Sequence, residues 1–261
     1  MRAVAPALSA LIILAVSITA EAAGMNKPYQ VGEEHFEGYF TTPFPEAPLI
    51  LLIHDWDGLT DYEMRRADML ADLGYAVFAA DMFGAGARPT ELEDKRRLTG
   101  DLDGNRHKMR ARLKGALAAA ESEGADIREA AAIGYCFGGT AVLELARSGA
   151  DLKGFVTFHG GLSTPEEQDY SKTKGAVLIL HGTADESVSM DDFADLANEL
   201  EKAGIPHEMI TYGGAPHAFT VFGSDRYRED ADKRSWERLK AFLAETLTSK
   251  TGREPTHETA E

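Results

Sequence analysis

The stretch Glu129-Ala-Ala-Ala-Ile-Gly134-Tyr-Cys136-Phe-Gly138-Gly-Thr140 contains the only cysteine of the 261-residue chain. Residues 129–134 predict a short buried strand, and residues 138–148 predict an apolar helix. Glycines two positions before and two positions after Cys136 would let the strand and the helix approach closely at a sharp turn. This is the layout of a nucleophile elbow, in which a reactive side chain projects from the top of a sheet. The alternative is a buried cysteine that serves as a small apolar core residue.

Strands and helices alternate on both sides of this elbow. The continuous apolar run at 49–53 lies between Pro48 and His54 and is typical of a central parallel strand that is covered on both faces. Further strands are predicted at 36–41, 75–80, 154–158, 176–180 and 207–212, and helices at 60–73, 106–123, 190–203 and 228–247. The alternation predicts an α/β fold with a doubly wound, mostly parallel sheet. In such a sheet, ligands bind beyond the carboxyl ends of the strands.

Two polar residues that follow predicted strands would complete a catalytic triad with Cys136. His217 lies in a loop rich in glycine and proline after the last strand, and its imidazole is suited to take the thiol proton. Asp185 lies between the two along the chain, which gives the order nucleophile, acid, histidine. A surface histidine and a helix-capping aspartate are the alternatives. Asp191 and Asp192 are better placed to cap the next helix.

An oxyanion hole is expected beside the nucleophile. One donor should be the backbone N–H of Phe137, the residue after the nucleophile. The second should come from the loop after the strand at 49–53, and the N–H of Trp56 is the best candidate. The indole of Trp56 would serve equally as a lid packed over the site, because the proposed donor belongs to the main chain.

The first 22 residues predict a secretory signal peptide. A basic Arg2 precedes an apolar run at 8–20, and Ala20-Glu-Ala22 places small residues before a cut at Ala23. This pattern predicts export, to the periplasm of a bacterial cell. An uncleaved anchor and a start at Met25 are the alternatives.

Composition limits the remaining possibilities. Residues 23–248 have the length of a single α/β domain, and residues 249–261 are polar, without apolar periodicity, and predict a disordered tail. A formal net charge of −16 disfavours nucleic acid and anionic membranes as partners. One cysteine cannot form an internal disulfide, so burial or chemistry must explain it.

The histidines do not predict a metal site, because no two of them are spaced as a tight ligand pair. Asp101-Leu-Asp103-Gly104 has part of a calcium-loop pattern but lacks the remaining ligands, and it is interpreted as a turn. We therefore expect neither a metal nor another cofactor. The sequence leaves the oligomeric state open.

Four motifs together resemble those of the dienelactone hydrolase family, whose members have the α/β-hydrolase fold. They are His54-Asp-Trp-Asp-Gly-Leu59, Gly134-Tyr-Cys-Phe-Gly-Gly139, His181-Gly-Thr-Ala-Asp185 and Gly214-Ala-Pro-His-Ala-Phe219, and the resemblance covers residues 36–247. It implies a hydrolase that cleaves a carboxylic ester or lactone through a cysteine acyl-enzyme, with a triad of Cys136, Asp185 and His217. It also implies a carboxylate that helps to deprotonate the thiol, and Asp55 occupies that position.

The chain departs from the family pattern at two positions. Asp55 stands where the family usually has a longer glutamate, and a loop-capping role is its alternative. Val221 stands where enzymes that act on dienelactone have an arginine for the substrate carboxylate. The second family arginine has three candidates after Asp81, namely Arg88, Arg96 and Arg97. An uncharged ester or lactone therefore fits this chain better than dienelactone, since a charged clamp contributes roughly 1.5–3 kcal/mol.

Two other functions remain open from the sequence. The departures at Asp55 and Val221 are compatible with a catalytically weak binding or scaffold protein on the same fold. A hydrolase of thioesters or small peptides would use the same residues, because all three reactions proceed by acyl transfer to a nucleophile.

Overall fold

The computed structural model describes residues 24–247. The predicted signal peptide at 1–22 and the predicted tail at 249–261 lie outside the described residues. Within the described range, no helix is long and apolar enough to cross a membrane.

An eight-stranded sheet forms the centre of the molecule, in the order β1-β2-β4-β3-β5-β6-β7-β8. The pairs from β4–β3 through β7–β8 are parallel, whereas β1–β2 and β2–β4 are antiparallel. The prediction of a mostly parallel sheet is therefore confirmed. The strands are β1 (Met25–Val31), β2 (Glu34–Thr41), β3 (Pro48–Ile53), β4 (Ala76–Ala80), β5 (Asp126–Tyr135), β6 (Gly154–Phe158), β7 (Ala176–Gly182) and β8 (His207–Tyr212).

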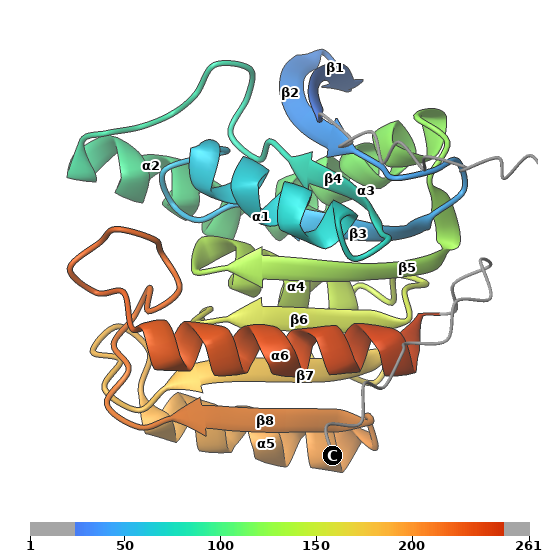
Figure 1. The fold of residues 1–261 in the computed structure, drawn as a ribbon. Coiled ribbons are helices and arrows are strands. Elements are labelled where there is room, and N and C mark those ends of the chain that lie inside the picture. Colours follow the sequence, from blue (N-terminus) through green and yellow to red (C-terminus); the bar gives the residue numbers. More distant parts are fainter. Residues whose placement is uncertain (1–23, 248–261) are drawn as a thin grey trace, which may run out of the picture.

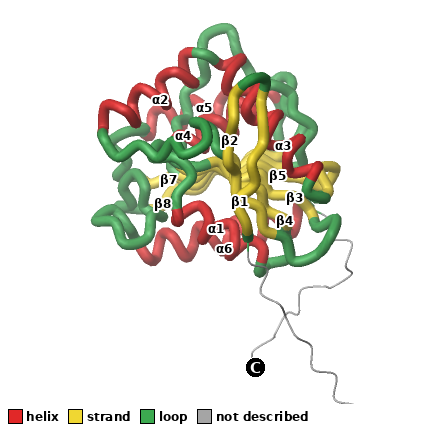
Figure 2. The backbone as a smooth tube through the Cα atoms, turned by 90° about the horizontal axis from the view of Figure 1, so that it is seen from above, coloured by secondary structure: helices red, strands yellow, loops and turns green. Residues whose placement is uncertain are grey.

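Helices cover both faces of the sheet, as expected for a doubly wound fold (Figures 1 and 2). The first and last helices lie on one face, and the other four lie on the opposite side. The helices are α1 (Asp61–Ala71), α2 (Leu92–Gly104), α3 (Arg106–Ser122), α4 (Phe137–Arg147), α5 (Met190–Ala203) and α6 (Glu229–Thr246).

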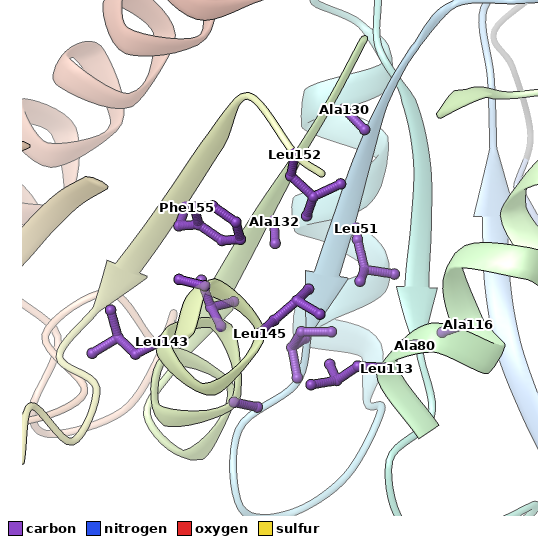
Figure 3. Close-up of a cluster of buried hydrophobic side chains, with 14 of the residues drawn as sticks. Leu51, Ala80, Leu113, Ala116, Ala130, Ala132, Leu143, Leu145, Leu152 and Phe155 are labelled. Carbon is purple, nitrogen blue, oxygen red and sulfur yellow. The ribbon is translucent and has the colours of Figure 1, made fainter. Parts of the chain in front are cut away.

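Strand β3 shows why the central run is apolar without interruption. Side chains alternate along a strand, so Leu49, Leu51 and Ile53 pack into one core layer while Ile50 and Leu52 pack into the other. The first layer brings Leu51 together with side chains of α3 and α4 (Figure 3). A strand that is buried on both sides carries mostly apolar side chains, so the loop at its end is the first place where several polar side chains can gather.

Two elements were not predicted, and both are polar. β1 pairs only with β2, alternates between exposed and partly buried residues, and has no apolar run. α2 buries Leu102 alone, so its sequence has no helical apolar stripe. The prediction of a turn at Asp101-Leu-Asp103-Gly104 is wrong, because these residues form the last turn of α2.

Candidate active site

Cys136 lies at the junction of β5 and α4 in a strained backbone conformation. Its φ and ψ angles are 52° and −114°, outside the regions that L-residues ordinarily occupy. The flanking glycines are required by close packing: a Cβ at Gly134 would lie 2.1 Å from the carbonyl of Gly138, and one at Gly138 would lie 2.3 Å from the carbonyl oxygen of Ile53. The elbow expected from the sequence is therefore present, and Cys136 at its tip is a partly exposed residue.

The structure brings the three predicted triad residues together. His217, in the loop after β8, places Nε2 3.1 Å from Cys136 Sγ. Its Nδ1 lies 2.8 Å from Oδ2 of Asp185, in the loop after β7. The carboxyl ends of the parallel strands β5 to β8 point to the same side, so residues up to 81 positions apart meet there (Figure 1).

The two carboxylate oxygens of Asp185 have different partners. Its Oδ1 accepts hydrogen bonds from the N–H groups of Ser187 at 2.8 Å and Val188 at 3.0 Å, while its Oδ2 faces His217. The following helix begins at Ser189, which caps it with Asp192. Burial acts to raise the pKa of Asp185, but the contacts with His217 and the two N–H groups outweigh it, and the pKa lies below its usual value. The carboxylate is therefore ionised and held in place.

The surroundings of Cys136 favour the protonated thiol over the thiolate. Loss of solvation is the largest cause that raises the pKa of Cys136, and the negative charge of Asp55 is the next. The N–H of Phe137 acts in the opposite direction. Proton removal from Cys136 therefore needs a base within reach, and His217 Nε2 is placed for it.

The two expected oxyanion donors belong to segments that meet at the elbow. The N–H of Phe137 is the first of α4 and has no carbonyl one turn earlier to bond to. Trp56 follows β3, whose end touches Gly138 in the first turn of α4. Lys95 lies 5.2 Å from the centre of the Trp56 indole and 3.8 Å from a carboxylate oxygen of Asp57, so α2 contacts the Trp56 loop.

Three carboxyl groups, those of Asp55, Asp57 and Glu63, lie in the loop after β3 and in the first turn of α1. Asp55 Oδ1 accepts a hydrogen bond from the N–H of Asp57 at 3.3 Å, which is the loop-capping role. Burial first, and then the charges of Asp57 and Glu63, raise the pKa of Asp55 well above its usual value. Among the described residues Asp55 has no hydrogen bond to Cys136, although its charge acts on the thiol.

Glu63, in the first turn of α1, was not identified as a site residue. It is fully buried, and its Oε2 accepts hydrogen bonds from the N–H of Thr60 at 2.9 Å and from the Thr60 hydroxyl at 2.8 Å. Its Oε1 accepts the N–H of Asp55 at 3.3 Å. Burial is the main cause that raises the pKa of Glu63 to about 7. The spacing Thr60-x-x-Glu63 is that of a capping box and was the available signal.

Three buried histidines lie at or just beyond the carboxyl ends of strands of the sheet. His54 accepts the N–H of Met82 at its Nε2, and burial lowers its pKa to about 4, so it is a neutral structural group. His181 stacks on Phe193, and neither of its nitrogens has a partner among the described residues. His159, at the end of β6, lies against His217 itself, with ring centroids 5.2 Å apart.

A cavity of about 440 Å³ opens beside the β3–α1 loop, with Arg88 on its wall. The Arg88 guanidinium donates to its own neighbour, the carbonyl of Ala87, at 2.9 Å, and it lies 4.0 Å from the buried carboxylate of Asp81. Arg96 and Arg97 are exposed on α2. Of the three candidates for the second family arginine, Arg88 alone lines this cavity. The carboxylate of Asp81 already neutralises part of its charge. Leu59, Thr60, Asp61, Tyr62 and Met64 complete the lining.

Between residues 24 and 247, no group of three or more His, Cys, Asp or Glu side chains is arranged to hold a metal ion.

Comparison with known proteins supports one family. The family model described as "Dienelactone hydrolase family" matches residues 36–247. The chain is similar to "Protein usf" of Aquifex pyrophilus, with 28% identity over 81% of this chain and 94% of that protein. It is also similar to the human "Carboxymethylenebutenolidase homolog", with 24% identity over 87% of this chain and 92% of that one.

A solved structure gives a third comparison. The crystal structure of a dienelactone hydrolase-like promiscuous phosphotriesterase from metagenomic libraries superposes with a TM-score of 0.82 and 30% identity. The match covers 88% of this chain and all of that one. The arrangement of the sheet and the helices thus belongs to a known architecture.

Proposed function

Because the chain belongs to the dienelactone hydrolase family, we propose that it hydrolyses small carboxylic esters or lactones through an acyl-enzyme on Cys136. The observation that carries the proposal is the continuous contact from sulfur to imidazole to carboxylate, at 3.1 and 2.8 Å, on a strained elbow. These are the contacts required of a nucleophile, a base and the group that orients the base. The carboxymethylenebutenolidase homolog among the relatives supports the same reaction class.

In the first half of the reaction, Cys136 Sγ attacks the carbonyl carbon while His217 Nε2 takes the thiol proton. The negative charge that develops on the carbonyl oxygen is stabilised by the N–H groups of Phe137 and Trp56. The C–O bond of the ester breaks, and the imidazolium of His217 returns the proton to the departing alkoxide. The product of this half is an alcohol, or the open hydroxyl end of a lactone, and a thioester on Cys136.

In the second half, water takes the place of the alcohol. His217 removes a proton from the water as it attacks the thioester carbonyl, and the same two N–H groups stabilise the charge. Collapse of the intermediate releases the carboxylic acid and restores the Cys136 thiol. Asp185 accepts the Nδ1–H of His217 throughout, which keeps Nε2 directed at sulfur and stabilises the transient imidazolium.

The acyl group of the substrate is proposed to be uncharged. Val221 supplies no cation at the position where the family has an arginine, and the Arg88 guanidinium is engaged by Ala87 and Asp81. An anionic acyl group would also approach a surface of formal charge −16. Asp55 adds to this, because its charge lies close enough to act on the reacting sulfur.

The test is a set of initial rates on matched substrates. One short acyl group is presented as an oxygen ester, a thioester and an amide, and the ester is made in neutral and carboxylate-bearing forms. The neutral ester should be hydrolysed, faster than its carboxylate-bearing counterpart. Complete alkylation of Cys136 should abolish that rate, and full ester hydrolysis after alkylation would overturn the covalent mechanism.

The same set separates the alternative functions. A thioester or an amide that is cleaved much faster than the oxygen ester would identify a thioesterase or a peptidase. Background rates on every substrate, equal for the unmodified and the alkylated protein, would favour a binding or scaffold protein.

A further inference from the structure

A chain of hydrogen bonds runs from helix α1 to the ring behind the proposed catalytic base. Arg66 Nε donates to Tyr62 Oη at 3.3 Å, and Tyr62 Oη lies 2.8 Å from Thr220 Oγ1. Thr220 Oγ1 in turn lies 2.8 Å from Nε2 of His159. All the links are buried, since Arg66, Thr220 and His159 are at most 1% exposed and the Tyr62 hydroxyl lies among them.

The direction of this chain follows from what each group can donate. An arginine only donates, so Tyr62 accepts from Arg66 and has its own hydroxyl proton free for Thr220. The Thr220 hydroxyl proton then points to His159 Nε2, which must accept it, and the proton of the neutral ring resides on Nδ1. In this direction the one member of the chain of hydrogen bonds that lacks a partner among the described residues is His159 Nδ1, and the neighbouring Tyr135 hydroxyl lacks one in either direction. The reverse direction would also deprive the Tyr62 hydroxyl proton of its acceptor in the chain, and unmatched buried groups are costly.

The start of the chain is firmly anchored. The Arg66 guanidinium is paired with the Asp232 carboxylate, and its Nη2 also donates to the main-chain carbonyl of Thr220 at 2.9 Å. Tyr227 donates to the other oxygen of Asp232 at 3.1 Å. Arg66 therefore contacts the backbone of Thr220 directly and the side chain of Thr220 through Tyr62. Thr220 lies three residues after His217, in the same loop.

The end of the chain touches His217. The ring of His159 meets that of His217 at an interplanar angle of 63° and meets Phe219 edge-on. His159 itself has a φ of 41°, in the left-handed region that L-residues rarely adopt. Such a conformation persists only where the surroundings enforce it, and this one aims the imidazole into the space behind His217.

We propose that His159 is a positioning residue, held as the neutral Nδ1–H tautomer by the chain from Arg66 through Tyr62 and Thr220, so that His217 alone takes up the reaction's proton. The proposal rests on the proposed function for the role of His217, but the tautomer of His159 is a property of the resting protein. A second imidazolium at this distance would repel the one that forms on His217.

The groups that face His159 agree with a neutral ring. Burial is the largest cause that lowers the pKa of His159 well below its usual value, and the neighbouring His217 is the second. Arg66 acts in the same direction, whereas the carboxylate of Asp185 opposes it. Tyr135, from β5, presents its ring to His159 at 6.1 Å.

The first test is nitrogen NMR of the full protein labelled with ¹⁵N-histidine, with no substrate present. His159 should show one protonated nitrogen, Nδ1, and an accepting Nε2, unchanged between pH 5 and pH 9. A His159 ring that titrates in this range would overturn the proposal. So would the Nε2–H tautomer, which would mean that the chain of hydrogen bonds runs the other way.

The second test compares Thr220→Val with Thr220→Ser. Valine keeps the shape and removes the hydroxyl, so the Nε2 resonance of His159 should lose its hydrogen-bond shift, and kcat should fall about tenfold with a KM change of less than twofold. Serine keeps the hydroxyl and should restore both. If Thr220→Val does not fold, Tyr62→Phe removes the previous link and should broaden the tautomer signature without loss of the ring packing.

The outcomes distinguish this proposal from the proposed function. Suppose that the natural protein shows the Nδ1–H tautomer of His159 and that Thr220→Val loses it with no change in a measurable kcat. This result would overturn the positioning role of His159 and leave the proposed hydrolase function intact. A protein without hydrolase activity whose His159 tautomer is pinned would refute the proposed function, and with it the role of His159 in the reaction.

Discussion

Two halves of the site meet at Cys136, and they are built differently. On one side, His217 and Asp185 form direct contacts with the thiol and with each other, at 3.1 and 2.8 Å. On the other side, the β3–α1 loop and the first turn of α1 hold buried carboxyl groups at Asp55 and Glu63 whose pKa values are raised. The first half is ordered by hydrogen bonds between charged or polar partners, and the second by a capping box and burial.

The difference indicates a division of labour. In the proposed mechanism the His217–Asp185 half transfers the proton, so its loss should lower the rate of hydrolysis. The β3–α1 half fixes a backbone donor and sets the electrostatic environment of sulfur, so its alteration should be felt first in stability and thiol reactivity. Each prediction below tests whether that division holds.

The largest effect is expected from the first half. His217→Ala removes the base that takes the thiol proton, and kcat/KM for the best ester should fall about 10⁴-fold. The matched control is His35→Ala, because His35 is exposed on β2 and, within the described residues, Gln30 is the only hydrogen-bond partner of its side chain. The control should change the rate less than twofold. A loss below tenfold in His217→Ala would remove the distinction between the halves.

In the half formed by the β3–α1 loop and its cap, Glu63 should make the free energy of unfolding depend on pH. Its pKa is about 7 in the folded protein against an ordinary value of 4.5, so the unfolded chain releases this proton first. The free energy of unfolding should therefore fall as the pH rises from about 4.5 to 7 and be flat above, for this group alone. The free energy of unfolding can be measured with urea at pH 5 and at pH 7.5. Between these two pH values it should decrease by about 2–3 kcal/mol more in the natural protein than in Glu63→Gln. Equal falls would contradict the burial argument.

Substitution of Asp55 should change the reactivity of the Cys136 thiol more than the stability of the fold. Its charge is the largest cause after desolvation that raises the pKa of Cys136, ahead of Asp57. Asp55→Asn should lower that pKa and accelerate alkylation of Cys136 by iodoacetamide about threefold near pH 8.5. Asp57→Asn is the matched control, and its effect should be smaller. A larger effect at Asp57 would show that the ranking of the two carboxylates is wrong.

The smallest effect is expected at the edge of the second half. Lys95 contacts both the Trp56 ring and Asp57, and such contacts contribute about 0.5–1 kcal/mol near the surface. Lys95→Met should lower kcat/KM about twofold, whereas Lys95→Arg should retain it. Lys108→Met serves as a control, because Lys108 pairs with Asp101 and Glu34 instead. A loss above tenfold at Lys95 would make the β3–α1 loop as important to the rate as the triad.

The same contrast explains what the sequence could predict. The elbow, the central strands and the order of Cys136, Asp185 and His217 follow from local patterns, because glycine spacing and apolar runs report directly on backbone geometry. The contacts among the three side chains agree with that order. β1 and α2 were missed since neither buries an apolar stripe that a pattern could reveal.

The β3–α1 half was harder to predict for a physical reason. The motif assigns Asp55 to the loop after β3, but its raised pKa results first from burial and then from the charges of Asp57 and Glu63, and Glu63 reaches Asp55 through a cap eight residues later. The chain behind His217 is less accessible still, because it joins Arg66, Thr220 and His159 from three distant segments. Contacts of that kind depend on tertiary packing and leave no local signal.

The central claim is that Cys136 carries the acyl group between the two halves of the reaction. The most direct measurement is rapid-quench mass spectrometry of the protein during turnover of a neutral aryl ester, followed by peptide mapping. We predict a transient mass increase of one acyl group on the peptide that contains Cys136, released by neutral hydroxylamine as a thioester should be. Steady turnover with an unmodified Cys136 peptide, or with the acyl group on another residue, would contradict the account.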